Sequence, residues 1–151
     1  MDIEITTMCA VFSDNKVLMI HRKRNWTGWA FLGGHLEPGE SLDGCVKREI
    51  FEESGLKIIN PSFVGITNIL NPELQRRHII FNYVANCYSG ELKEECDEGK
   101  IQWIDIDSIT EYELAEGMEY RLPLFLENKF SELYIEWKEN QGYTKVEYVR
   151  K

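Results

Sequence analysis

One segment constrains the fold more than any other, because it predicts a helix that turns carboxylates toward its own protein. Residues 33–56 read GGHLEPGESLDGCVKREIFEESGL. Ser41 suits an N-cap, and Gly55 suits the left-handed position after a last helical turn. At about 100° per residue, the apolar positions of this helix share an arc of roughly 140° with Glu49 and Glu53. Two carboxylates therefore lie inside the stripe that should be buried.

Something must compensate these buried charges. A solvated acidic face is the alternative, but the other side of the helix already carries a lysine, an arginine and a serine for water. Burying unpaired carboxylates is costly, and a divalent cation offsets the cost. Mg²⁺ prefers oxygen ligands and shares its shell with substrate phosphates. Arg48 can orient Glu52 four residues later, Glu40 can reach back over the same face, and Gly33 lets the backbone approach the ion.

The same residues recur at the fixed spacing of a known motif. Gly34 is followed after five residues by Glu40, and after seven more by REIFEESGL, which runs from Arg48 to Leu56. This pattern resembles an intact Nudix box, so the chain is similar to the Nudix hydrolase superfamily. The resemblance implies an α/β fold, a Nudix-type α/β/α sandwich with a mixed β-sheet and a loop-helix-loop catalytic motif. It also implies cleavage of a nucleoside diphosphate-linked substrate with Mg²⁺, for which Mn²⁺ can substitute.

Spacing and resemblance together assign roles at this site. Glu49 and Glu53 point inward and are expected as primary metal ligands. Glu52 is expected as the general base or water-orienting ligand, with Glu49 as the alternative base. The segment CDEGKIQW resembles one in MutT-type nucleotide sanitisers, which implies a metal ligand at Glu98, whose alternative is a solvated loop charge. The expected metal residues are thus Gly33, Glu49, Glu52, Glu53 and Glu98, and the expected catalytic residues are Glu52, Glu49, Arg48 and Glu40.

The substrate is expected to meet basic and aromatic side chains. Arg22 and Lys23 are candidates to grip outer phosphates, although both suit an ordinary charged loop. A pocket formed by YELAEGMEY and the strand around Phe81 and Tyr83 is expected to hold the base by stacking. Glu116 is the candidate to accept hydrogen bonds from a purine edge.

The box does not name the leaving group, and several substrates stay open. CDEGKIQW and the block LPLFLENKFSELYIEW resemble oxidised-purine nucleoside triphosphatases. This favours hydrolysis of a nucleoside triphosphate, with 8-oxo-dGTP as one form, to a monophosphate and pyrophosphate. Leu114 and Gly117 depart from the base-recognition pattern of those relatives. The alternative is an ADP-ribose or nucleotide-sugar pyrophosphatase, for which Pro72 is a weak signal. A non-catalytic nucleotide-binding regulator is a remote alternative, because it would need broken catalytic glutamates.

Composition limits the remaining function classes. A chain of 151 residues that is 43% hydrophobic and 28% charged predicts one globular domain over residues 1–151. A net charge of −9 argues against a partner that is a nucleic-acid polymer. The N-terminus lacks the basic start of a signal peptide, the apolar runs are too short for a bilayer, and four scattered cysteines predict free thiols. We therefore expect a cytoplasmic monomer or homodimer whose partner is a small nucleotide, with no membrane partner.

Strands and helices are expected to alternate along the chain. A second helix is predicted over Met118–Lys129, with Pro123 weakening its middle, and the tail after it alternates like a hairpin. The expected strands are Ile3–Phe12, Val17–His21, Trp29–Leu32, Phe63–Leu70, Arg77–Tyr88 and Ile101–Ile106.

Overall fold

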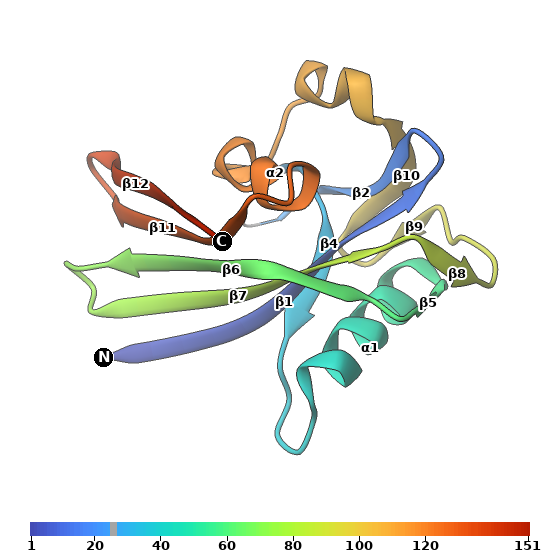
Figure 1. Cartoon of the computed structure of the whole chain (residues 1–151), viewed down its shortest axis with the longest axis horizontal. Coiled ribbons are helices and arrows are strands. Elements are labelled where there is room, and N and C mark those ends of the chain that lie inside the picture. The colour runs from blue at the N-terminus through green and yellow to red at the C-terminus, as the bar shows by residue number, and fades with distance from the viewer. Residues whose placement is uncertain (25–26) are drawn as a thin grey trace.

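A mixed sheet of ten strands organises the computed structural model, which describes residues 1–24 and 27–151 (Figure 1). The strand order is β12-β11-β6-β7-β1-β2-β10-β9, with β3 paired to β2 and β4 paired to β1. The strands are β1 (Asp2–Ser13), β2 (Lys16–Arg22), β3 (Gly28–Ala30), β4 (Leu32–His35), β6 (Ser62–Asn71), β7 (Arg76–Ala85), β9 (Glu95–Cys96), β10 (Gly99–Asp105), β11 (Phe130–Lys138) and β12 (Gly142–Arg150). A separate pair joins β5 (Lys57–Ile59) to β8 (Cys87–Ser89).

Strand β1 lies at the centre of the sheet and has neighbours of both directions. It runs parallel to β7 from Asp2 to Val11, and antiparallel to β4 from Thr6 to Cys9. Its last residues form the expected hairpin with β2. The single strand predicted over residues 29–32 is instead two strands, because β3 pairs with β2 and β4 pairs with β1. This change of partner brings the Gly33-Gly34 pair beside the middle of β1.

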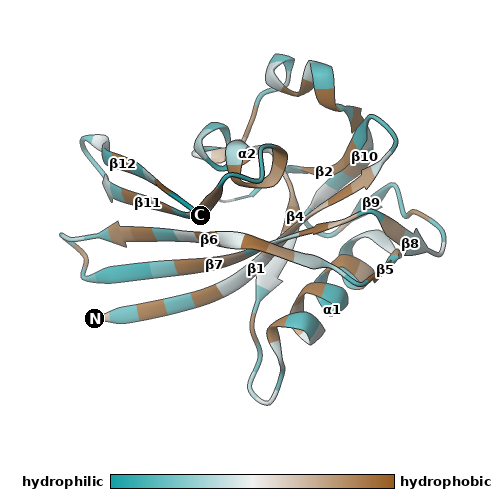
Figure 2. Cartoon of the chain, viewed as in Figure 1, coloured by the Kyte–Doolittle hydropathy of each residue, from teal (hydrophilic) through white to brown (hydrophobic). Residues whose placement is uncertain are grey.

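Helices cover both faces of the sheet, as an α/β/α sandwich requires (Figure 1). On one face lies α1 (Leu42–Ser54), which packs Val46 and Ile50 against a core that includes Leu18 and Leu32. On the other face lie the 3₁₀ helix η1 (Ile106–Glu111) and α2 (Met118–Leu126), whose Leu124 lies in a second core cluster. Figure 2 shows the alternation of hydrophilic and hydrophobic residues along the strands between these layers.

The ends of α1 form as the sequence predicts. The Ser41 hydroxyl accepts a hydrogen bond from the Gly44 amide at 3.0 Å, and Gly55 adopts φ 81° at the C-terminal end. Ser54, expected to face water, is instead buried, and its hydroxyl donates to the Ile50 carbonyl at 2.6 Å. The second helix ends at Leu126 rather than Lys129, because the chain is already turning into β11. In the described part of the chain, no helix has the length and apolarity to cross a bilayer.

Candidate active site

The guanidinium of Arg48 organises the carboxylates of α1. Its Nε and Nη2 atoms donate to the two carboxylate oxygens of Glu40, at 2.6 and 3.0 Å. Its Nη1 atom donates to Glu49 at 2.8 Å and to Glu52 at 3.3 Å, while Nη2 also donates to the His35 carbonyl at 2.9 Å. The paired hydrogen bonds from Arg48, helped by the Glu37 amide, lower the pKa of Glu40 to about 2. Arg48 thus links Glu40 and the His35 carbonyl, which precede α1, to Glu49 and Glu52 of the helix.

Glu53 lies deeper than the other glutamates of α1, and no lysine or arginine among the described residues forms an ion pair with it. Its side chain is 6% exposed, and one carboxylate oxygen accepts a hydrogen bond from the Gly33 amide at 3.0 Å. Burial, followed by the hydrogen bond and charge of Glu98, raises the pKa of Glu53 to about 10. The loop residue Glu98 therefore lies next to the helix residue Glu53.

Glu49 lies in a space that only glycine leaves open. A Cβ atom added to Gly34 would lie 2.2 Å from the carboxyl carbon of Glu49. Burial raises the pKa of Glu49, the charges of Glu52 and Glu98 add to this effect, and Arg48 opposes it. Glu52 is the outermost member, with 56% of its side chain exposed. Glu49 and Glu53 thus face inward and Glu52 lies at the rim.

These carboxylates fit a hard divalent cation in their chemistry. Glu98 lies close enough to Glu49 and Glu53 to raise the pKa of both, and a divalent charge would relieve that repulsion. Among the described residues, no three acidic, histidine or cysteine side chains already stand in an ion-holding arrangement. The reason is visible in their contacts, since Glu49 is turned to Arg48 and Glu53 to the Gly33 amide. A metal would compete for oxygens that these donors now hold.

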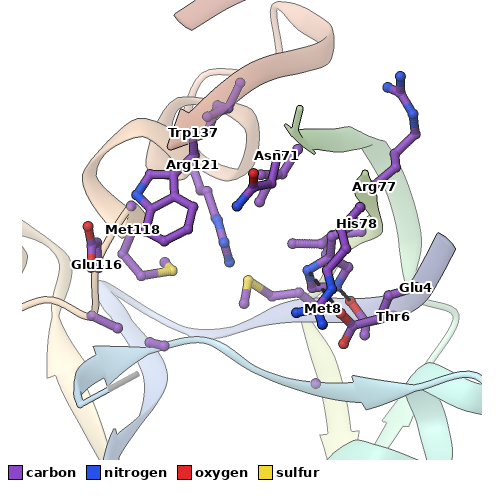
Figure 3. Close-up of a pocket in the computed structure, with 18 of the residues that line it drawn as sticks. Glu4, Thr6, Met8, Asn71, Arg77, His78, Glu116, Met118, Arg121 and Trp137 are labelled. Carbon is purple, nitrogen blue, oxygen red and sulfur yellow. Dashed lines mark hydrogen bonds and ion pairs between the residues drawn. The ribbon is translucent and has the colours of Figure 1, made fainter. Parts of the chain in front are cut away.

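Glu49, Glu52 and Glu53 of α1, together with Glu98, are called the acidic cluster below. A cavity of about 850 Å³ opens beside this acidic cluster, on the α2 side of the sheet. Its floor comes from β1, β4, β6, β7 and β11, and its wall comes from the segment 115–118 and α2 (Figure 3). Gly33, Gly34 and Glu98 line its border with the carboxylates. Such a volume lies in the range of small-molecule sites. The cavity and the acidic cluster are thus adjacent parts of one site.

Some residues expected at the substrate side reach the cavity and others do not. Arg22 and Glu116 line it. Lys23 is not among the lining residues, and its amide donates to the Glu98 carbonyl at 3.3 Å. Phe81 and Tyr83 lie on the opposite face of β7, where both belong to the core beneath α1.

The expectation that Phe81 and Tyr83 stack on the base is therefore wrong for this cavity. Side chains alternate along a strand, and in the middle of β7 it is His78 and Ile80 that line the cavity, together with Arg76 and Arg77 at the start of the strand. The aromatic wall is instead supplied by Trp137 of β11, with Tyr143 of β12.

The sequence reasoning missed several residues of the cavity. Arg121 of α2 enters it, as Figure 3 shows. At the other end, Glu4 meets His35 at 2.5 Å, and His78 contacts Thr6 at 2.8 Å. Arg121 had one local signal, because it shares a helical face with apolar Met118, three residues earlier. No local signal pointed to the contacts of His35 and His78, because these histidines and their partners come from three different strands.

Comparisons with known proteins show which sequences this chain resembles. The sequence model of the NUDIX domain matches residues 3–125. The Bacillus subtilis protein named uncharacterized Nudix hydrolase YvcI is 36% identical over 115 residues, which cover 74% of this chain and 72% of that protein. The mouse oxidized purine nucleoside triphosphate hydrolase is 32% identical over 133 residues, covering 82% of this chain and 80% of that one.

The fold also has a close counterpart among solved structures. The MutT protein of Bacillus halodurans superposes with a TM-score of 0.82 at 24% identity, covering 96% of this chain and 97% of that one. At this identity the likeness concerns the fold, including the mixed sheet between helical layers.

Proposed function

The chain belongs to the Nudix hydrolase family, whose members cleave pyrophosphate-linked nucleotides, and we propose that its substrate is a nucleoside triphosphate cut between the α and β phosphates. One observation carries the proposal: the acidic cluster of α1 borders a cavity large enough for a nucleoside. The triphosphate would lie over the cluster, with its base in the cavity. The name of the mouse relative, an oxidized purine nucleoside triphosphate hydrolase, supports this substrate class.

The acidic cluster is proposed as the catalytic centre. Glu49, Glu53 and Glu98 would hold Mg²⁺ or Mn²⁺, with Gly33 giving the backbone its close approach. When bound, the metal would neutralise phosphate charge and lower the pKa of a water molecule. Arg48 keeps Glu49 and Glu40 in place through its three shortest carboxylate contacts, at 2.6, 2.8 and 3.0 Å. Preorganisation of this kind is the main contribution that a protein makes to phosphoryl transfer.

Glu52 is proposed as the general base. It is more exposed than Glu49 and Glu53, and its one contact with Arg48, at 3.3 Å, is longer than those that Arg48 makes with Glu40 and Glu49. In the proposed step, an oxygen–phosphorus bond forms from water and the bridging phosphorus–oxygen bond breaks. One proton of the water passes to the Glu52 carboxylate, and the electron pair of the broken bond leaves with pyrophosphate. Arg22, which lines the cavity near Glu98, would contact the phosphates.

A substrate and product analysis tests the proposal. Purified protein with Mg²⁺ is given dGTP, dATP, 8-oxo-dGTP and ADP-ribose, and products are separated by anion-exchange chromatography. We expect monophosphate and pyrophosphate from at least one triphosphate. Release of a nucleoside diphosphate and orthophosphate would contradict the proposed bond. If kcat/KM for ADP-ribose exceeds that of every triphosphate by about tenfold, the enzyme is an ADP-ribose pyrophosphatase instead.

A further inference from the structure

Two guanidinium groups face the cavity, and neither has a partner among the residues that the structure describes. Arg121 of α2 and Arg22 of β2 both line it, and the Nε atom of each is buried without a hydrogen bond. Within residues 1–24 and 27–151, neither side chain forms an ion pair or a side-chain hydrogen bond. Burial lowers the pKa of Arg121, and the nearby charge of Arg22 lowers it further. A folded protein rarely leaves such donors unused, because a buried charged group without a hydrogen-bond partner loses its hydration with nothing to replace it.

The surroundings of Arg121 describe the ligand that would satisfy it. Figure 3 shows its side chain extending from α2 toward the strands, in a space also lined by Trp137, Met118 and Met8. Aromatic and thioether groups suit the face of a flat ring. Asn71 adds a donor, since its Oδ1 atom accepts from the Leu74 amide while its Nδ2 atom donates to no described residue. The inner cavity thus offers apolar faces together with donors, and its ligand should be a flat ring with acceptors on its edge.

Glu116 supplies the opposite chemistry in the same cavity. It is exposed and lines the wall just before α2. Burial, followed by the charge of Glu116, raises the pKa of Tyr143 to about 12, so Glu116 lies near that ring. A carboxylate accepts hydrogen bonds and repels phosphate, so this wall does not suit a second anion. One edge of the ligand should therefore carry acceptors for Arg121, and another edge should carry donors for Glu116.

Guanine is the nucleobase that has both edges. Its O6 and N7 atoms are adjacent acceptors that match an arginine fork, and its N1–H and N2–H groups are adjacent donors that match a carboxylate. Adenine places an amino donor beside N7, which would face the guanidinium. Oxidation at C8 places a hydrogen on N7, so 8-oxoguanine loses one of the two acceptors. An arginine on the O6–N7 edge and a carboxylate on the N1–N2 edge would therefore discriminate against both adenine and the oxidised base.

Resting on the triphosphate hydrolysis proposed above, we propose that Arg121 is a specificity-determining residue that binds the O6 and N7 atoms of unoxidised guanine, with Glu116 on the N1–N2 edge. The preference is then the reverse of the one that the name of the mouse relative describes. The oxidised base would be a poorer ligand here, because an N–H group would point at a guanidinium.

Equilibrium binding of monophosphates without metal tests base recognition separately from hydrolysis. Isothermal titration calorimetry in EDTA compares dGMP, dAMP, 8-oxo-dGMP and 7-deaza-dGMP, in which a carbon replaces N7. We expect dGMP to bind about 10- to 100-fold more tightly than each of the other three, the discrimination typical of a paired arginine–guanine contact. Equal affinity for dGMP and 7-deaza-dGMP in the wild-type protein would overturn the proposal.

Variants then assign the discrimination to Arg121. Arg121→Met keeps an unbranched side chain and should bring the ratio of dGMP to 7-deaza-dGMP affinity close to one. Arg121→Lys keeps the charge without the fork and should lose most of the ratio. The matched control is Arg77→Met, because Arg77 also lines the cavity but already donates to Asn68 at 2.7 Å. That variant should keep the wild-type ratio.

The remaining outcomes separate the possible errors. If Arg121→Met weakens all four monophosphates equally, Arg121 holds phosphate and the proposal is wrong. The melting temperature of Arg121→Met should hold or rise, since an unpaired buried charge is removed, and a fall of more than about 5 °C would indicate a structural role that overturns it. Hydrolysis of triphosphates without base preference would leave the proposed function intact and refute only the role of Arg121. If the expected binding ratios are found but no triphosphate is hydrolysed, the role of Arg121 in base recognition stands and the proposed hydrolysis is refuted.

Discussion

At the scale of single residues, Glu52 and Glu53 are neighbours in sequence with different surroundings. Glu52 is mostly exposed and held by one long contact, whereas Glu53 is buried beside Glu98. The first prediction follows from the proposed role of Glu52. Glu52→Gln should lower kcat by about a hundredfold or more, the usual cost of a lost base, while the free energy of unfolding changes little. Steady-state kinetics with urea denaturation measures both. Near-normal kcat would move the base to Glu49.

The second prediction concerns the pH dependence of stability in the metal-free protein. The pKa of Glu53 is about 10 in the folded protein, against 4.5 as its ordinary value. A carboxyl group with a raised pKa stabilises the fold fully below its unfolded pKa, and this contribution is lost as pH rises through the folded value. Without metal, the protein should therefore become less stable between about pH 5 and pH 10.

Glu53→Gln is the matched variant for that prediction, because the amide keeps the shape of a protonated carboxyl and can still accept from the Gly33 amide. It should flatten the loss of stability and raise the free energy of unfolding at pH 8 by about 1 kcal/mol or more. Urea denaturation at several pH values in EDTA measures this. Parallel pH profiles for variant and wild type would show that Glu53 is ionised in the folded protein.

At the scale of elements, β4 carries two glycines with different duties. A Cβ at Gly33 would lie 2.0 Å from the Thr7 carbonyl oxygen of β1, which is backbone and cannot yield. A Cβ at Gly34 would instead meet the carboxylate of Glu49, the movable end of a side chain. Gly33→Ala should therefore destabilise the protein by about 1–3 kcal/mol. Gly34→Ala should keep most stability but displace Glu49 and lower kcat on the order of a hundredfold.

Thermal unfolding together with kinetics separates these two glycine effects, and each variant serves as the control for the other. The assignment fails if Gly34→Ala retains wild-type kcat, because Glu49 would then function without its position against β4.

The elements also show what a sequence can predict. The ends of α1 and the inward direction of Glu53 depend on capping and on a period of 3.6 residues, which are local properties, and the structure has both. The same helical reasoning applied to α2 would have found Arg121. The face of the sheet on which Phe81 lies could not be predicted in this way. Alternation along β7 defines two faces, but only the sheet order and the placement of α1 decide which one borders the cavity.

The register between strands that are distant in the sequence could not be predicted from the sequence either. The split of the predicted strand at residues 29–32 arises because β3 and β4 pair with different strands, whose paired residues lie 6 to 10 positions earlier for β3 and 23 to 29 positions earlier for β4. The contact between Glu4 of β1 and His35 of β4 follows from that choice. Propensity and periodicity carry no information about such pairings, so these parts of the site come from the structure alone.

At the scale of the whole molecule, the net charge of −9 and the acidic cluster mean that electrostatic repulsion destabilises the folded state. A cation that binds only the folded state stabilises it by mass action, by about 2.7 kcal/mol at a hundred times its dissociation constant. For a chain of this length, that corresponds to a rise in melting temperature of roughly 5–10 °C. We expect Mg²⁺ and Mn²⁺ to produce this rise, and its size should grow from pH 6 to pH 9 as Glu49 and Glu53 release their protons more readily to the metal.

Non-specific screening must be separated from binding, since NaCl also weakens repulsion across a protein of this charge. The measurement is differential scanning calorimetry in MgCl₂ and in NaCl of equal ionic strength, for the wild type and for Glu49→Gln. The wild type should gain more from MgCl₂ than from NaCl, and Glu49→Gln should lose most of that excess while keeping the NaCl response. An excess that persists in Glu49→Gln and does not vary with pH would place the ion elsewhere on the acidic surface, and the acidic cluster of α1 would then not be the metal site.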